Sequence, residues 1–469
     1  MKKKYVRWTL WTIASPFILF IILCILIYLP PIQNFLVDKA AVYASEATGM
    51  NISVGRISLS FPLNLVVTDV DAASPHKDTL LSVRRLQVNV QLLPLLKKQV
   101  EVDGISLQGA TVNSNDLIHG MRLNGTLGEL FISSHGVALD PETAIVNKVL
   151  LKDTDLSLCL NDTAAADTAA SDTAYWKIIL QDIDLQNVSF ALDMPLDSLS
   201  LAASLDNATL RDGLIDLHKS AYSLQTFRIK NGRVRYDSGR PSATASADSL
   251  SAGLDPSHIA LTDIGVKLDS LYYEGRNMKA IISQFVLKER SGVEIVSATG
   301  RMVSNDKVLR VPSLKLETRD SYLELNAAMD WNALDFKDEG LVSARLMADI
   351  GKPDVVRFMG SMDEKFIRQY PSEPLRIRTG IDGDLNKLKL TTLTAELPGA
   401  LGLFARGELT HLTDSLLRGG DITLEAETKD LKFVSTLAEG IEIPYGTRLE
   451  GKFTMAGTKM GTDLLLMQP

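Results

Sequence analysis

The stretch 48–62, TGMNISVGRISLSFP, decides the fold class of this chain. Ile52 and Val54 occupy even positions between polar residues, whereas Ile57 and Leu59 occupy odd positions. Because side chains of a β-strand alternate between its two faces, this change of parity would turn half of the apolar set over. One extra residue, absorbed as a β-bulge, would keep all four on one face. The stretch therefore predicts a bulged strand with one apolar face.

The same pattern, apolar-x-apolar-x-x-apolar-x-apolar, recurs along the chain. Its copies are Ile52–Leu59, Ile105–Val112, Ile183–Phe190, Leu309–Leu316 and Leu388–Ala395, with near copies at Phe227–Val234 and Val266–Tyr273. Composition alone would give about two clean copies. The copies are spaced at about 40 residues or twice that, which indicates a degenerate structural repeat.

Three copies carry a residue type suited to a bulge. The residue before the third apolar position is Gly109, Asn187 or Asn231, and these types tolerate a positive φ. We expect bulges with positive φ there. Three other copies depart from this chemistry, with Arg56, Ser313 and Thr392 at the same position.

From Asn51 onward the sequence predicts one strand after another, punctuated by Gly, Asn, Asp and Pro. At about 12 residues for a strand and its turn, the chain would form on the order of 35 strands. Short helices are expected only near Val355–Phe358 and Phe433–Ala438. A packed β-sandwich or barrel and an open sheet with an apolar groove would show the same alternation.

An uncharged apolar run precedes the strands. Residues 9–29, TLWTIASPFILFIILCILIYL, are long enough to cross a bilayer as one helix, with Trp8, Trp11, Phe17 and Leu29 as anchor residues. All nearby cations lie on its N-terminal side, at Lys2, Lys3, Lys4 and Arg7, so we expect residues 1–8 in the cytoplasm. A cleaved signal peptide is the alternative, but it would have a shorter core and a small-x-small cleavage site.

Residues 30–49 predict a short amphipathic helix, because apolar residues recur at steps of three and four before Gly49. Packing of this helix on the next domain is one interpretation, and capping of the sheet is another. Everything after the anchor would lie outside the cytoplasm, where disulfides are permitted. Only Cys159 lies there, so no internal disulfide is expected.

Composition and motifs exclude several function classes. The formal net charge of −8 argues against nucleic acid as a partner. The six histidines are scattered, and neither a catalytic motif nor metal-ligand spacing occurs, so we predict no catalytic residues, no metal, no cofactor and no enzyme activity. The outline of a phosphate loop at 446–452 is followed by Phe453 instead of Ser or Thr, and it continues as a strand.

Residues 161–174, NDTAAADTAASDTA, lack large apolar side chains and predict a mobile loop. The three Asp-Thr-Ala triplets resemble an O-glycosylation signature of some Gram-negative bacteria, which would place sugars on Thr163, Thr168 and Thr173. A plain flexible insertion is the simpler interpretation.

Several segments resemble one family. The segments at 48–70, TGMNISVGRISLSFPLNLVVTDV, and 80–113, LLSVRRLQVNVQLLPLLKKQVEVDGISLQGATVN, look like the N-terminus of the AsmA-like superfamily. Within it they are closest to the TamB-like members, the subunits of the translocation and assembly module. Residues 378–412 and 446–466 are similar to the degenerate strand repeats of that family. The resemblance covers nearly the whole chain, and 43–113 is its specific part.

The resemblance implies a mainly β fold, in which a transmembrane helix and a short amphipathic helix precede an elongated, curled, repetitive β-sheet with an apolar groove. It implies a bridge-like protein, anchored in the inner membrane with its bulk in the periplasm, that guides phospholipid towards the outer membrane. A scaffold for outer-membrane protein insertion or secretion is the alternative. The family's C-terminal region, which meets an outer-membrane partner, is absent from this sequence, so we expect the N-terminal part of a longer protein or a truncated member.

The expected organisation follows. It comprises a cytoplasmic tail at 1–8, a transmembrane helix at 9–29, a short amphipathic helix at 30–49, an AsmA/TamB-like β region at 50–160, a low-complexity loop at 161–174 and a repetitive β-groove region at 175–469. The candidate groove residues are taken from the repeated motif: Ile52, Val54, Ile105, Leu107, Ile183, Leu185, Leu388 and Leu390.

Overall fold

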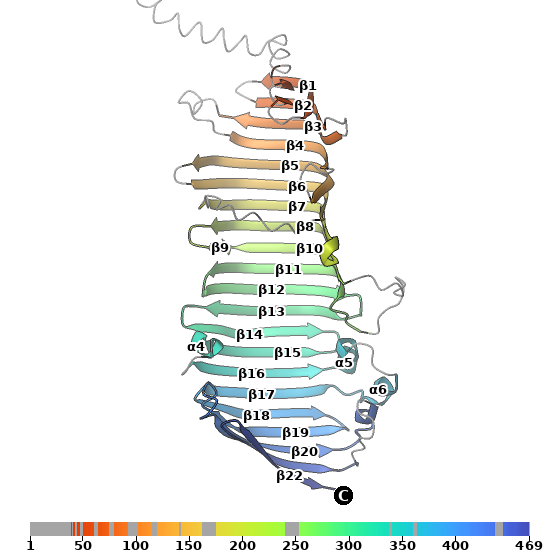
Figure 1. The fold of residues 1–469 in the computed structure, drawn as a ribbon, viewed down its shortest axis with the longest axis vertical. Coiled ribbons are helices and arrows are strands. Elements are labelled where there is room, and N and C mark those ends of the chain that lie inside the picture. The colour runs from red at the N-terminus through yellow and green to blue at the C-terminus, as the bar shows by residue number, and fades with distance from the viewer. Residues whose placement is uncertain are drawn as a thin grey trace, which may run out of the picture. The chain divides into compact units, whose positions relative to one another are not determined.

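The chain is mainly β, as the alternation predicts. A computed structural model describes residues 39, 41–42, 45–46, 50–60, 64–74, 79–91, 102–114, 120–139, 142–161, 175–239, 253–336, 340–359, 364–436 and 444–468. Its strands, β1 to β22, are assigned to a 22-stranded, mostly antiparallel sheet (Figure 1). The contacts divide the chain into two compact units, 1–207 and 208–469, and each unit is described by itself.

The predicted number of about 35 strands is wrong for the described residues, which form 22. The reason is strand length. Strands β5 and β6 each span 19 residues, and β7 and β8 each span 18. A bulge lets a strand continue past a change of parity that would otherwise end its apolar face.

Unit 1 is a series of neighbouring strands. They are β1 (Asn51–Ser60), β2 (Asn64–Ala73), β3 (Thr79–Val90), β4 (Val102–Asn113), β5 (Met121–Leu139), β6 (Glu142–Leu160) and β7 (Lys177–Met194). Each strand from β1 to β6 pairs with the next in antiparallel fashion, whereas β6 and β7 are parallel. The single-turn helix η1 (Pro195–Asp197) follows β7, and the division between the units falls within β8 (Leu199–Asp216).

Unit 2 continues with antiparallel strands. They are β9 (Ala221–Leu224), β10 (Thr226–Ser238), β11 (His258–Glu274), β12 (Asn277–Glu289), β13 (Glu294–Ser304), β14 (Val308–Thr318), β15 (Tyr322–Asp330), β16 (Leu341–Ile350), β17 (Leu375–Asp384), β18 (Lys387–Leu397), β19 (Leu401–Thr410), β20 (Gly419–Thr428), β21 (Arg448–Ala456) and β22 (Lys459–Met467). From β10 to β22 each strand pairs with the next, and β9 pairs with β8 and β11.

Short helices lie at strand ends of unit 2 (Figure 1). They are α4 (Trp331–Leu334), α5 (Lys352–Met359), α6 (Glu364–Gln369) and η2 (Val434–Thr436). Helices α5 and η2 confirm the two predicted positions, although η2 is a single 3-10 turn. Helices α4 and α6 were not expected, because six residues or fewer carry too little helical periodicity.

The N-terminal predictions fall largely outside the described residues. The anchor at 9–29, with Trp8, Trp11, Phe17 and Leu29, belongs to that part of the chain, as do most of 30–49 and the triplets at Thr163, Thr168 and Thr173. In the described part of the chain, no helix combines the length and apolar character that crossing a membrane requires.

Candidate functional site

One face of unit 1 is apolar from strand to strand. Directly opposed residues of neighbouring strands share a face, so the pairing register defines rows that cross the sheet. One row joins Leu59, Leu65, Val88, Ile105, Ile132, Val149 and Ile183, and the next joins Ile57, Val67, Leu86, Leu107, Leu130, Leu151 and Leu185. Four of the predicted residues, Ile105, Leu107, Ile183 and Leu185, thus lie on this face.

Two further rows lie beyond the bulge. They join Val54, Val70, Val83, Ala110, Leu127, Thr154 and Val188, and Ile52, Ala72, Leu81, Val112, Gly125, Leu156 and Phe190. Ile52 and Val54 therefore share the face of the other candidates despite the change of parity. The predicted positive φ is confirmed, with 63° at Gly109, 52° at Asn187 and 54° at Asn231, and each of these residues is left out of the strand pairing.

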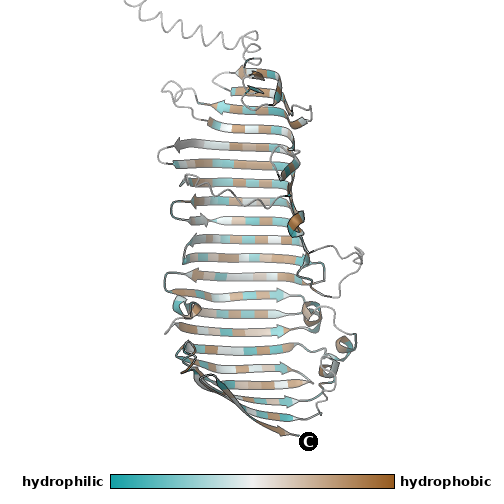
Figure 2. Cartoon of the chain, viewed as in Figure 1, coloured by the Kyte–Doolittle hydropathy of each residue, from teal (hydrophilic) through white to brown (hydrophobic). Residues whose placement is uncertain are grey.

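Unit 2 carries an equivalent apolar face from β14 to β22. One row joins Leu316, Leu323, Ala348, Ile377, Ala395, Leu403, Ala426, Leu449 and Leu466, and another joins Val311, Ala327, Ala344, Ile381, Leu390, Gly407, Ile422, Phe453 and Thr462. Leu388 lies on the same face, opposite Leu409. Figure 2 shows the hydrophobic and hydrophilic bands that alternate along these strands.

The opposite face of unit 2 carries the charges. Cross-strand ion pairs join Arg378 to Asp349 at 2.7 Å and Lys387 to Glu408 at 3.2 Å. Each side chain alternates with the apolar residues of its own strand. None of the six rows described above contains a charged residue, so the sheet of unit 2 has one face suited to water and one suited to hydrocarbon.

Most side chains of the apolar rows are only half-buried. Leu59, Leu107, Leu185 and Leu390 are all intermediate in exposure, and Ile105 is 36% exposed. A facing second sheet would bury such side chains, as in a β-sandwich. The described strands instead belong to a single sheet. A contiguous apolar face of this kind is unfavourable in water unless another molecule or segment covers it.

Buried side chains gather at one end of the strands that carry the apolar rows of unit 2. The α6 cluster consists of Phe366, Tyr370, Leu397, Ala400, Leu431 and Phe433. Its aromatic rings pack with centroid distances of 5.2 to 5.8 Å, and Leu375 and Leu401 of the apolar face pack against it. The cluster thus bounds the apolar face at this end.

The opposite ends of these strands have their own cluster. The α4 cluster consists of Ala333, Val342 and Leu385, with Met329, Ile381 and Leu388 packed against it. On β18, Leu388 at the first end contacts the α4 cluster, and Leu397 at the last end belongs to the α6 cluster. Between them, Leu390, Leu393 and Ala395 remain half-buried. Unit 2 therefore presents an apolar floor bounded at both strand ends.

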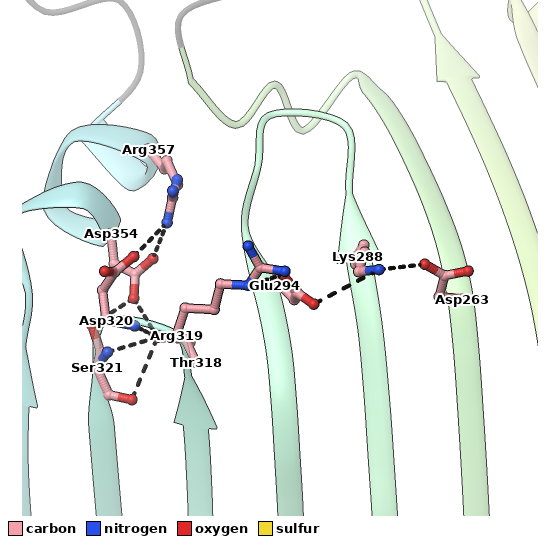
Figure 3. A network of polar contacts seen from close by, with 9 residues as sticks. All are labelled: Asp263, Lys288, Glu294, Thr318, Arg319, Asp320, Ser321, Asp354 and Arg357. Atoms are coloured by element: carbon pink, nitrogen blue, oxygen red, sulfur yellow. Dashed lines mark hydrogen bonds and ion pairs between the residues drawn. The ribbon is translucent and has the colours of Figure 1, made fainter.

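A polar network holds α5 at the strand ends (Figure 3). The Asp354 side chain is 1% exposed and accepts hydrogen bonds from Ser321 Oγ at 2.6 Å, from Arg357 at 2.9 Å and from Thr318 Oγ1. Arg357 also contacts Asp320 at 3.0 Å. Burial acts to raise the pKa of Asp354, but these donors outweigh it and lower the pKa below its ordinary value.

The network also crosses β11, β12 and β13. Lys288 contacts Asp263 at 2.7 Å and Glu294 at 3.8 Å, and Arg319 contacts Glu294 at 2.5 Å (Figure 3). Asp263, Lys288 and Arg319 are exposed, whereas Glu294 is 20% exposed. Ion pairs with such exposure contribute little to the free energy of unfolding, so these pairs mainly orient the strand ends. Every charge of the network has a partner of opposite sign, which is typical of a structural role.

Within the described residues, no group of three or more His, Cys, Asp or Glu side chains is placed to hold a metal ion. The eight predicted groove residues lie on the apolar faces of their own units, six in unit 1 and two in unit 2. Sequence reasoning missed the two clusters that bound the apolar floor of unit 2. The aromatic residues Phe366, Tyr370 and Phe433 were the available signal, because such residues are uncommon in this chain.

Comparison with protein-family models and with curated protein sequences gives no match for this chain. What the apolar faces can do is therefore inferred from their own geometry and chemistry.

Proposed function

We propose that the chain is an inner-membrane-anchored periplasmic protein that guides phospholipid along an apolar β-groove towards the outer membrane. In this proposal the sheet is elongated and curled, its apolar face lines the groove, and its charged face meets water. Acyl chains cover the half-buried leucines and isoleucines, and headgroups remain at the open side. The chain acts by binding and guidance and carries out no chemical reaction.

One observation carries the proposal. The apolar rows cross many strands without a charged side chain, and most of their side chains stay half-buried within the part of the chain that the structure describes. Hydrocarbon chains are the complement of such a surface, because burying apolar area is favourable by about 25 cal/mol per Å². The α4 and α6 clusters support the proposal, since they limit the floor along the strands.

Two parts of the proposal, the membrane anchor and the outer-membrane partner, are supported by the sequence. The apolar run at 9–29 and the cations before it favour a single-pass anchor with a cytoplasmic N-terminus. The partner at the outer membrane rests on the family resemblance alone.

Mass spectrometry of co-purified lipid tests the proposal. The full chain, purified in a mild detergent, should carry phospholipid. A triple variant, Leu107→Asp, Leu185→Asp and Leu390→Asp, should lose most of it, because a carboxylate on an acyl-lined surface is costly to desolvate. Lipid transfer between vesicles should fall in the same variant.

The matched control places the same charges on the opposite face. Gln108, Gln186 and Thr392 are paired within rows of that face, and their replacement by Asp should leave lipid binding and transfer unchanged. Circular dichroism confirms that both triple variants fold. A folded Leu-to-Asp variant that carries and transfers lipid at the parental level would refute the groove, and the scaffold function would then be favoured.

A further inference from the structure

A continuous line of residues outside the ladder pairing crosses unit 1. At one level of the sheet, each strand from β1 to β7 has one residue that is left out of the strand pairing. The register is the same on both sides of this residue, because the neighbouring strand also leaves out one residue there. These crease residues are Gly55, Asp69, Arg84, Gly109, Gly128, Asp153 and Asn187. Each one opposes the next, so the bulges of neighbouring strands coincide.

Four of the crease residues have a positive backbone φ angle. The φ angle is 54° at Asp69, 63° at Gly109, 49° at Asp153 and 52° at Asn187. A non-glycine residue adopts such angles rarely, and Asp and Asn are among the types that tolerate them best. The angles recur at one level of the sheet, which indicates a built feature of the unit rather than separate local irregularities.

Side chains on the line are complementary between strands. In each of the pairs β1–β2, β3–β4 and β5–β6, one crease residue is glycine and the other carries a side chain. A Cβ atom at Gly55 would lie 2.9 Å from Cβ of Asp69, at Gly109 3.2 Å from Cβ of Arg84, and at Gly128 2.8 Å from Cβ of Asp153. Asn187 Nδ2 in turn donates to Asp153 Oδ1 at 2.8 Å. Neighbouring strands thus restrict each other's crease residues.

We propose that this crease is a register lock for β1 to β7. A strand that slipped by one residue would place its crease residue against a paired position of its neighbour and would turn its apolar set over. In every strand, the extra residue shifts the alternation of side chains between the two faces by one position. Apolar side chains on both sides of the line then share one face, whichever molecule covers that face.

A double-mutant cycle tests the coupling between strands. In the full chain, Gly55→Ala should lower the thermal midpoint, because its Cβ meets the Asp69 side chain. In an Asp69→Gly background, the same substitution should cause less than half of that fall, since the obstructing side chain is gone. Gly402→Ala is the control, as a Cβ there meets nothing within 4 Å. If Gly55→Ala matches the control, or if its effect is the same in both backgrounds, the crease residues are not coupled and the proposal fails.

A deletion tests the register itself. Removing Asn187 leaves β7 without its extra residue, so one half of the strand must turn Ile183 and Leu185, or Val188 and Phe190, to the other face. Hydrogen exchange should show lost protection in β6 and β7. Asn187→Gly keeps the residue count and permits the positive φ, so its protection should remain close to parental. A deletion variant as protected as the parent would overturn the lock.

Discussion

At the scale of single residues, this chain depends on a few positions where backbone and side chain are both constrained. Asp354 is an example, because a carboxylate that is 1% exposed is retained only with several donors around it. Gly351 is another, since its amide donates to Ser321 Oγ at 3.0 Å while a Cβ atom on it would meet the Asp320 backbone. Both residues fix α5 to the turn between β14 and β15.

Replacing Asp354 with Asn should destabilise unit 2 by about 1–3 kcal/mol, because donors that now meet a charge would meet a neutral amide. The pKa of Asp354 is lowered in the folded chain, so its stabilising effect is present above the ordinary pKa of about 3.9 and is lost as the pH falls below it. Urea unfolding from pH 6 to pH 3 measures both effects. The parent should lose more stability than the variant over the acidic part of this range.

Glu364→Gln is the control for that experiment, since Glu364 forms an exposed pair with Arg368 and its side chain is 87% exposed. Its stability and its pH dependence should match the parent. Equal acid sensitivity of the parent and Asp354→Asn would show that the buried carboxylate does not contribute.

Replacing Gly351 with Ala should also loosen α5. A Cβ at this position would lie 2.3 Å from the Asp320 carbonyl oxygen, a contact that requires the backbone to shift. We expect a loss of about 1–3 kcal/mol, as for overpacking in a core. Thermal unfolding should show the loss, whereas Gly402→Ala should have a midpoint close to the parent's. A tolerated Gly351→Ala would mean that the turn moves away at little cost.

At the scale of elements, strands supply the apolar face and short helices lie along its edges. The strands follow from local alternation, because each strand needs only a pleat and a partner to place its apolar set. Helices of four to eight residues are too short to be stable alone. Their stability comes from tertiary contacts, namely the α4 and α6 clusters and the Asp354 network.

Truncating the α6 cluster should separate α6 from the sheet. Phe366 is 2% exposed and packs against Tyr370 and Phe433, so Phe366→Ala should cost about 3–5 kcal/mol. Phe358→Ala on α5 is the matched control, because Phe358 is 57% exposed and its loss should stay within about 0.5 kcal/mol. Denaturant unfolding distinguishes the two variants. Similar losses for both would contradict the assignment of the cluster as a boundary of the floor.

At the scale of the whole molecule, the proposed groove requires a particular particle in solution. A compact chain of this length would have a radius of gyration of roughly 22 Å. A groove that conducts lipid between membranes must be extended, so small-angle scattering of the full chain should give a clearly larger value. A measured radius near that of a compact chain would contradict the elongated groove, while leaving the apolar face of each unit as described.

The sequence by itself determined the fold class, the apolar face and the bulges. Alternation acts between neighbouring residues, so the pattern alone assigns Ile52, Val54, Ile57 and Leu59 to one face of a bulged strand. Gly109, Asn187 and Asn231 could be placed at positive φ for the same local reason.

Only the tertiary structure decided what lies beside these residues. For the residues that the structure describes, the strand count was overestimated, because the sequence shows where a face changes but not whether the strand continues through a bulge. The alignment of the bulges into one crease, the parallel pairing of β6 with β7, and the two clusters at the ends of the apolar floor all join residues that are far apart in the chain. Such contacts depend on register and packing across strands, and no local pattern in one strand specifies its neighbour.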